Sequence, residues 1–258
     1  MSAIWAAIPA AWLTIGAVAC GATAAGFAEG AAEVEFPLLA LSLWAWTLPP
    51  QLAGPLAVFG ALIGAVVGLF PLRGFDLRRI APFAIGGALG APIGVFLLHN
   101  ADPPHFRAAI GALLAGYALF SLMFPDSTRA KGGGAGAAAF VGVVGGALGG
   151  FCGLAAAAPA VWTRLSGWKR EPRRAATNAV VIVVAALTLA AYAGAGVVIP
   201  EDLRLFAIVA SLALVASFLG GRLVGRAGAP ALARTALLLS FASGAALLVV
   251  ATRSLWGR

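Results

Sequence analysis

The sequence predicts an all-α polytopic membrane protein with two inverted-topology halves, each a broken or re-entrant helix pair plus three transmembrane helices. The chain is 62% hydrophobic and only 10% charged, whereas soluble domains average roughly 45–50% and 25%. Apolar runs close to the ~20 residues that cross a bilayer recur along the whole length. These runs are continuous rather than alternating, which indicates helices and not the strands of a barrel.

The chain divides into two membrane repeats, 1–124 and 134–258, joined by a polar, glycine-rich linker at 125–133 that we expect to be cytoplasmic. The predicted segments are a broken pair at 4–47, spans at 51–71, 79–99 and 104–124, a second broken pair at 134–166, and spans at 174–198, 203–225 and 231–252. The two segments of the second pair are short for complete spans. We therefore expect a re-entrant hairpin there.

The two broken pairs carry similar motifs. Gly26-Phe27 is followed by Pro37 in the first pair, and Gly150-Phe151 is followed by Pro159 in the second. Proline is tolerated in the first turn of a helix, so each one marks a helix that restarts. Broken hydrophobic segments at corresponding positions in two halves indicate a transporter's binding site. Two helix N-termini, each with a partial positive charge, would then face a midplane space that suits an anion. The alternative is that the glycines only permit tight helix packing.

Segment counting and charge give the same topology. In each repeat the helix pair enters and leaves the membrane on the same side, and three more spans follow. The second repeat therefore starts on the opposite side of the membrane from the first. That arrangement places 13 of the 17 Lys and Arg residues on one face, which should be cytoplasmic. Both termini then lie outside. The net charge of +8 is explained by these short loops, so no nucleic-acid partner is expected.

Three carboxylates lie within seven residues near the first break, namely Glu29, Glu33 and Glu35. A charge in the bilayer centre costs about 2.5–3.5 kcal/mol on insertion scales. Glu29 and Glu33 would share a helix face if the helix continued through them. The functional interpretation is proton carriage or cation binding, with Glu33 or Glu35 coupling proton movement to transport. The alternative is an exposed bend that reaches water.

The second half offers fewer polar candidates. Thr177 and Asn178 form an adjacent polar pair inside an apolar span, and they contact either substrate or a neighbouring helix. Cys152 lies beside the second break, next to Gly150, where a thiol could meet a sulfur compound or simply fill space. The glycine rows Gly60/Gly64/Gly68, Gly86/Gly90/Gly94 and Gly142/Gly146/Gly150 predict faces for close helix packing.

These motifs resemble the TauE/SafE sulfite-exporter-like transporters. The likeness rests on the Gly-Phe-x-x-Gly…Pro element at Gly26–Pro37, its second copy after a central linker, and Gly167-Trp168-Lys169 with Arg174–Asn178 after that copy. It extends over essentially the whole chain in segment order. The family's first copy usually has a glycine triplet before the proline, where this chain has residues 31–36 with two glutamates.

The resemblance implies a secondary transporter for a small anion in the bacterial inner membrane, with a sulfur oxyanion, sulfonate or organic acid as substrate. A proton gradient or the membrane potential would drive it, because the chain has no nucleotide motif. Two alternatives stay open: a proton- or cation-coupled carrier of a neutral or cationic metabolite, and a non-transporting scaffold or assembly protein. No catalytic residues, metal or cofactor are expected. Membrane lipids are expected partners, and the sequence does not specify an oligomeric state.

Overall fold

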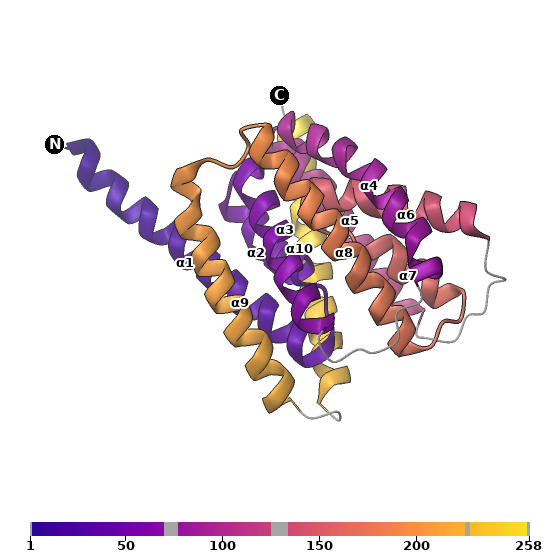
Figure 1. The fold of residues 1–258 in the computed structure, drawn as a ribbon. Coiled ribbons are helices and arrows are strands. Elements are labelled where there is room, and N and C mark those ends of the chain that lie inside the picture. The colour runs from indigo at the N-terminus through magenta and orange to yellow at the C-terminus, as the bar shows by residue number, and fades with distance from the viewer. Residues whose placement is uncertain (1, 70–76, 125–133, 225–227, 257–258) are drawn as a thin grey trace.

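A computed structural model describes residues 2–69, 77–124, 134–224 and 228–256, and these residues form a helical bundle (Figure 1). The helices are α1 (Ser2–Ala32), α2 (Phe36–Thr47), α3 (Pro50–Leu69), α4 (Leu77–His99), α5 (Pro103–Met123), α6 (Ala135–Cys152), α7 (Ala157–Leu165), α8 (Arg170–Gly194), the short 3-10 helix η1 (Pro200–Asp202), α9 (Leu203–Leu223) and α10 (Ala229–Trp256). The bounds follow the predicted segments to within a few residues, and the largest differences are α8, which starts and ends four residues earlier than predicted, and α10, which ends four residues later.

Eight of the described helices are long and apolar enough to cross a membrane. They confirm the prediction of an all-α polytopic membrane protein. The two broken pairs have the same form, in which a long helix is followed by a short one. The short members are α2, with 12 residues, and α7, with nine. Neither is long enough to cross a bilayer by itself, because about 20 residues are needed.

Each pair breaks at a residue with left-handed backbone. Glu33 has φ +57° and directly follows α1, while Gly153 has φ +82° and directly follows α6. Each of these residues donates its backbone amide to the carbonyl four residues earlier, on Glu29 and Gly149. The Gly-Phe pairs that mark the breaks in the sequence are themselves helical, so the chain departs from the helix a few residues later than those pairs suggest.

The break at Glu33 also changes the predicted arrangement of the carboxylates. Glu29 and Glu33 were expected to share a helix face if the helix continued. The helix ends at Ala32, and the two side chains go to different neighbours, Glu29 to α3 and Glu33 to α8.

Helices of one half pack mainly on helices of the other. The most extensive contacts are α4 with α6, α1 with α9, and α5 with α10, and α3 also packs on α8. In each of these four contacts a helix of one predicted repeat packs on a helix of the other, whereas the short helices α2 and α7 pack mainly within their own repeat. Two related repeats would produce such packing between their helices. The inverted relation between the repeats stays a prediction.

Two of the predicted glycine rows explain the close approach of α4 and α6. A Cβ at Gly86, Gly90 or Gly94 on α4 would collide with backbone carbonyls of α6. The row Gly142/Gly146/Gly150 on α6 meets α4 carbonyls in the same way. Without side chains in between, the two backbones touch, as in small-residue packing of membrane helices.

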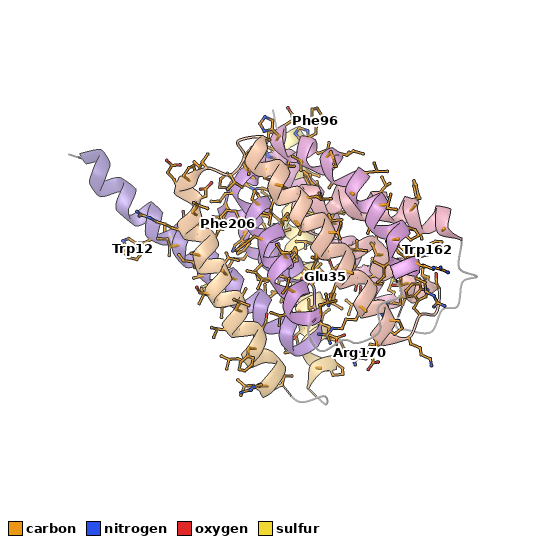
Figure 2. The ribbon with its side chains drawn as sticks, viewed as in Figure 1. Trp12, Glu35, Phe96, Trp162, Arg170 and Phe206 are labelled. Carbon is orange, nitrogen blue, oxygen red and sulfur yellow. The ribbon has the colours of Figure 1, made fainter. Side chains whose placement is uncertain are left out.

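The start of α1 and the end of α10 lie toward the same end of the bundle, as do the α4–α5 and α8–η1 connections (Figure 1). The α7–α8 connection, with Lys169 and Arg170, lies toward the opposite end (Figure 2). Several cations assigned to the cation-rich face lie outside the described residues, namely Arg73, Arg129, Lys131 and Arg226. Which face is cytoplasmic stays a prediction.

Candidate functional site

The candidate site is built along one face of α3, where small residues recur every three or four positions. The second break contacts the first half of this face, at Gly54 and Ala57. A Cβ on Gly54 would lie 3.2 Å from the carbonyl oxygen of Phe151, and one on Gly153 would lie 2.9 Å from the carbonyl carbon of Ala57. The first break and the start of α8 contact the second half of this face, from Gly60 to Gly68, which we call its lower part. The two breaks therefore lie at neighbouring levels of the same helix.

The lower part of this face accommodates side chains instead of a second backbone. The ring of Phe36 lies over Gly60, and the carboxylate of Glu29 lies against Gly64. A Cβ on Gly68 would lie 2.7 Å from Nδ2 of Asn178 and 3.5 Å from Nη2 of Arg174. This glycine row is therefore a packing face, as predicted, but side chains of α1, α2 and α8 pack on it and not a second backbone. Its glycines make room for an aromatic ring, two charged residues and an amide.

Glu29 lies in the last turn of α1, just before the break. Its Oε2 atom is buried and has no hydrogen-bond partner among the described residues. The backbone amide of Phe36 faces the carboxylate, and Arg174 and Glu35 are the charged groups near it. Phe36 is the first residue of α2, so this helix N-terminus faces a carboxylate of the chain itself, an arrangement that the helix dipole favours.

Glu33 pairs with two arginines of α8. Its Oε1 lies 2.7 Å from Nη1 of Arg174 and 3.2 Å from Nη2 of Arg170, and the Arg170 Nε donates to Oε2 at 3.2 Å. The side chains of Glu33 and Arg174 are about one third exposed, while Arg170 is 69% exposed. This cluster joins the first break to the start of α8, near the end of the bundle that Arg170 marks (Figure 2).

Glu35 precedes α2 and accepts a hydrogen bond of 2.9 Å from the hydroxyl of Tyr117 on α5. Arg164 of α7 is the nearby cation that acts on it. The three carboxylates thus separate into three surroundings, supplied by α3, α8 and α5. A single exposed bend would not divide them in this way.

A tyrosine also supports the second break. Tyr192 on α8 is buried and donates a hydrogen bond to the carbonyl of Gly150. Cys152 is buried, and its thiol donates to the Leu148 carbonyl at 3.3 Å, one turn back in its own helix. The thiol therefore has an ordinary structural role in this conformation.

Both prolines occupy the first turns of short helices, as predicted. Pro37 is the second residue of α2, and Pro159 is the third residue of α7. Both are buried, and Pro159 lies against Gly145 of α6, where a Cβ would come within 2.9 Å of its ring. The proline ring thereby fixes how closely α7 returns along α6.

The polar pair of α8 divides between two roles. The Thr177 hydroxyl is shared between the carbonyls of Arg173 and Arg174, both 3.1 Å away in its own helix. Asn178 instead extends toward α3 beside Gly68. Of the two, only Asn178 takes part in the cluster around the first break.

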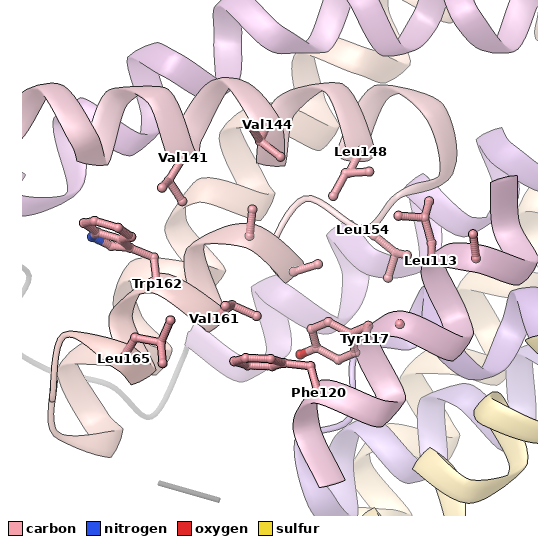
Figure 3. Close-up of a pocket in the computed structure, with 14 residues that line it drawn as sticks. Leu113, Tyr117, Phe120, Val141, Val144, Leu148, Leu154, Val161, Trp162 and Leu165 are labelled. Carbon is pink, nitrogen blue, oxygen red and sulfur yellow. The ribbon is translucent and has the colours of Figure 1, made fainter. Parts of the chain in front are cut away.

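An apolar pocket of about 450 Å³ lies between α5, α6 and α7 (Figure 3). Leu113, Tyr117 and Phe120 line it from α5, Val141 and Val144 from α6, and Val161 and Trp162 from α7. Tyr117 connects this pocket to the first break, because its ring lines the cavity while its hydroxyl binds Glu35. Nearly all of the lining is hydrocarbon, so the pocket does not suit a free small anion.

No group of three or more His, Cys, Asp and Glu side chains that could hold a metal ion occurs in the part of the chain that the structure describes. The ionisable residues near the breaks pair with arginine, tyrosine or backbone. The charged groups at this site are therefore held by ion pairs and hydrogen bonds within the protein.

Four residues of this site were not among the predicted site residues. Arg170 and Arg174 belong to the 13 cations predicted for the cytoplasmic face, and they pair with Glu33. With Asn178 they are spaced i, i+4, i+8, which places them on one face of a helix. Tyr117 and Tyr192 are the two tyrosines of the chain, and both lie within apolar spans. A polar hydroxyl in such a span needs a partner, and this was the available signal.

Comparison with known proteins identifies one family. The model of the sulfite exporter TauE/SafE family matches residues 13–247, nearly the whole chain. No curated protein matches, and no solved structure matches. The match includes both breaks, the face of α3 and the start of α8. The chain therefore belongs to the TauE/SafE sulfite exporter family of membrane transport proteins.

Proposed function

We propose that this protein is a secondary transporter that moves a small anion across the bacterial inner membrane. A sulfur oxyanion, a sulfonate or an organic acid is the substrate class, and a proton gradient or the membrane potential is the driving force. The observation that supports this most is the arrangement along α3. Both broken helices, together with Arg174 and Asn178 of α8, meet the same glycine-rich face, where small residues leave room for polar side chains.

The charges at this face favour an anion over a neutral substrate. Arg170 and Arg174 are both directed at the first break, and arginine is the side chain best suited to bind planar or branched oxyanions. Family membership agrees, because the matching family is described by sulfite export. A non-transporting scaffold would have no evident need for charged residues beside a helix break.

The experiment is flux into proteoliposomes that contain the purified full-length protein. Labelled sulfite, sulfoacetate and acetate are tested with an imposed pH gradient and, separately, with an imposed membrane potential. We expect saturable uptake of at least one anion above protein-free liposomes. Labelled choline is the control cation. Choline uptake without uptake of any tested anion would contradict the proposed substrate class.

One observation favours proton coupling. The Oε2 of Glu29 is buried without a hydrogen-bond partner among the described residues, and Glu35 is one of the charged groups that act on this carboxylate. An unpaired carboxylate oxygen in such surroundings is costly unless it takes up a proton or another cation. Glu29 therefore stays a candidate coupling residue together with Glu33 and Glu35.

The coupling test compares Glu29→Gln, Glu35→Gln and the matched control Glu201→Gln, which changes an exposed carboxylate on η1. We expect anion flux in the Glu29 variant to lose its response to an imposed pH gradient, while the control keeps it. If both site variants retain the full response of the wild type, these carboxylates do not couple protons to transport.

A further inference from the structure

Three side chains on α8 form a row of hydrogen-bond donors that runs from the surface into the bundle. Arg170 is 69% exposed and Arg174 is 33% exposed. Asn178 lies one turn further on, with its Nδ2 beside Gly68 of α3. Successive members are four residues apart, so they share one face of the helix. Arginine offers only N–H donors, and the Asn178 amide places its Nδ2 donor beside Gly68.

A carboxylate of the chain already occupies the outer part of this row. Glu33 receives three contacts from the two guanidinium groups, at 2.7, 3.2 and 3.2 Å. These distances are those of charge-assisted hydrogen bonds, and both carboxylate oxygens take part. The two-oxygen pattern of a carboxylate resembles that of a sulfite or sulfonate group closely enough to use the same donors.

Glu33 is also a residue whose present position is strained. Its φ of +57° is a conformation that residues other than glycine rarely adopt, and it lies between α1 and α2 where the helix has ended. Gly153 fills the corresponding place after α6 without this strain. The arginine contacts are therefore a large part of what holds the Glu33 side chain in this orientation, and their loss would free the break to move.

A second buried polar group lies one helical turn from the inner end of the row along α3. The Oε2 of Glu29 is buried, has no hydrogen-bond partner within the described ranges, and lies against Gly64, one helical turn from Gly68. Arg174 acts electrostatically on this carboxylate from α8, as does Glu35 from the break. The buried oxygen and the Asn178 amide thus lie one helical turn apart along α3, and the oxygen lacks a partner among the described residues.

We infer that Arg170, Arg174 and Asn178 form the anion-binding site, and that the Glu33 carboxylate is a built-in competitor which the substrate anion displaces. This inference rests on the proposed function and assigns its substrate residues. Displacement exchanges one anion for another at the same donors, so it leaves no arginine unpaired. It also releases Glu33 from α8, which links anion binding to movement of the first break.

The inference predicts an unusual effect of removing a charged residue of the site. In Glu33→Gln the competing charge is absent while the donors of α8 remain, so an added anion should bind more tightly. If the Glu33 cluster were only a structural link between α1 and α8, the same substitution would lower stability and leave anion affinity unchanged or weaker. The sign of the change in affinity separates the two interpretations.

Binding of sodium sulfite and of sulfoacetate is measured by calorimetry on the purified full-length protein. We expect Glu33→Gln to lower the apparent Kd at least threefold, and Glu201→Gln to leave it unchanged. Arg174→Gln should weaken binding at least tenfold, whereas Arg253→Gln, an exposed arginine in the last turn of α10, should not. If Arg174→Gln fails to fold, Arg170→Gln takes its place, since that side chain is largely exposed.

Wild-type binding together with an equal or higher Kd in folded Glu33→Gln would overturn the competitor role alone. Wild-type binding that survives both arginine substitutions would overturn the assigned site. Absence of binding by the wild type and by Glu33→Gln, for both anions, would overturn the inference, while saturable flux of any tested anion would still support the proposed function. The flux experiment then shows whether another class of substrate is carried.

Discussion

At the scale of single residues, both breaks need a residue with left-handed backbone, and the two breaks use different residue types for it. The chain leaves α6 through Gly153, which adopts positive φ at little cost. It leaves α1 through Glu33, where the left-handed conformation costs about 1–2 kcal/mol. The ion pairs to α8 offset part of that cost. The first break is therefore stabilised by the ion pairs of Glu33, which another anion can replace. The second break is stabilised by the backbone freedom of Gly153 and needs no such ion pairs.

Gly153→Ala should destabilise the protein. A Cβ at this position would combine positive φ with a 2.9 Å approach to the Ala57 backbone, so we expect a loss of about 1–3 kcal/mol. The measurement is thermal or denaturant unfolding in detergent. Gly136→Ala is the matched control, because a Cβ there meets nothing within 4 Å. Equal stability of the two variants would contradict the role assigned to Gly153.

The Tyr117–Glu35 hydrogen bond should appear as an energetic coupling. In a double-mutant cycle of Tyr117→Phe and Glu35→Gln, we expect a coupling energy of about 1 kcal/mol, within the range seen for polar contacts between membrane helices. Tyr192→Phe is the control. Its partner is the Gly150 carbonyl, so it should be additive with Glu35→Gln. Additive effects for Tyr117 would mean that the bond contributes nothing.

At the scale of helices, three glycine rows with the same spacing have two different functions. The rows of α4 and α6 remove side chains so that two backbones touch, which produces the most extensive helix contact in the bundle. The row of α3 removes side chains so that Phe36, Glu29 and Asn178 have room. The spacing of the glycines determines that one face of the helix carries no side chains. The neighbouring helix determines whether backbone or side chains pack on that face.

Gly90→Ala should separate α4 from α6. The added methyl would collide with the Val143 carbonyl, and we expect a loss of about 1–3 kcal/mol of stability. Gly16→Ala on α1 is the control, because nothing lies within 4 Å of its Cβ. There the higher helix propensity of alanine should add up to about 1 kcal/mol. Unfolding in detergent measures both, and similar shifts in the two variants would contradict the packing role.

At the scale of the whole molecule, the two ends of the chain lie toward one end of the bundle, and the α7–α8 connection lies toward the other (Figures 1 and 2). The excess of Lys and Arg predicts that the second end is cytoplasmic. Anions from the cytoplasm would then first meet Arg170 and Arg174. This orientation fits a family described by export, in which the substrate enters from inside the cell.

The orientation is tested with fused reporters. Alkaline phosphatase after residue 258 should be active, because it would be periplasmic, and a fluorescent protein inserted in the 125–133 linker should fluoresce, because it would be cytoplasmic. Each fusion is paired with the other reporter at the same position as its control. A C-terminal reporter that reads as cytoplasmic would contradict both the topology and the direction of entry proposed here.

Composition and periodicity were sufficient to predict the membrane segments. A helix in lipid must make all of its backbone hydrogen bonds within itself, so it appears in the sequence as a continuous run of apolar residues. The breaks could be located only approximately. A Gly-Phe pair is compatible with a helix, and the chain leaves the helix where a residue such as Glu33 is stabilised by distant partners. No local pattern specifies Arg170 and Arg174 as those partners.

By itself the sequence determined the class of the protein, the order of its helices, the two broken pairs and the carboxylates near the first break. Those features depend on local composition and on spacing along one segment. Only the tertiary structure decided that Glu33 pairs with α8, that Glu35 binds Tyr117, and that Glu29 lies against α3. These contacts join residues from 35 to 141 positions apart, and such a pairing depends on how the helices pack.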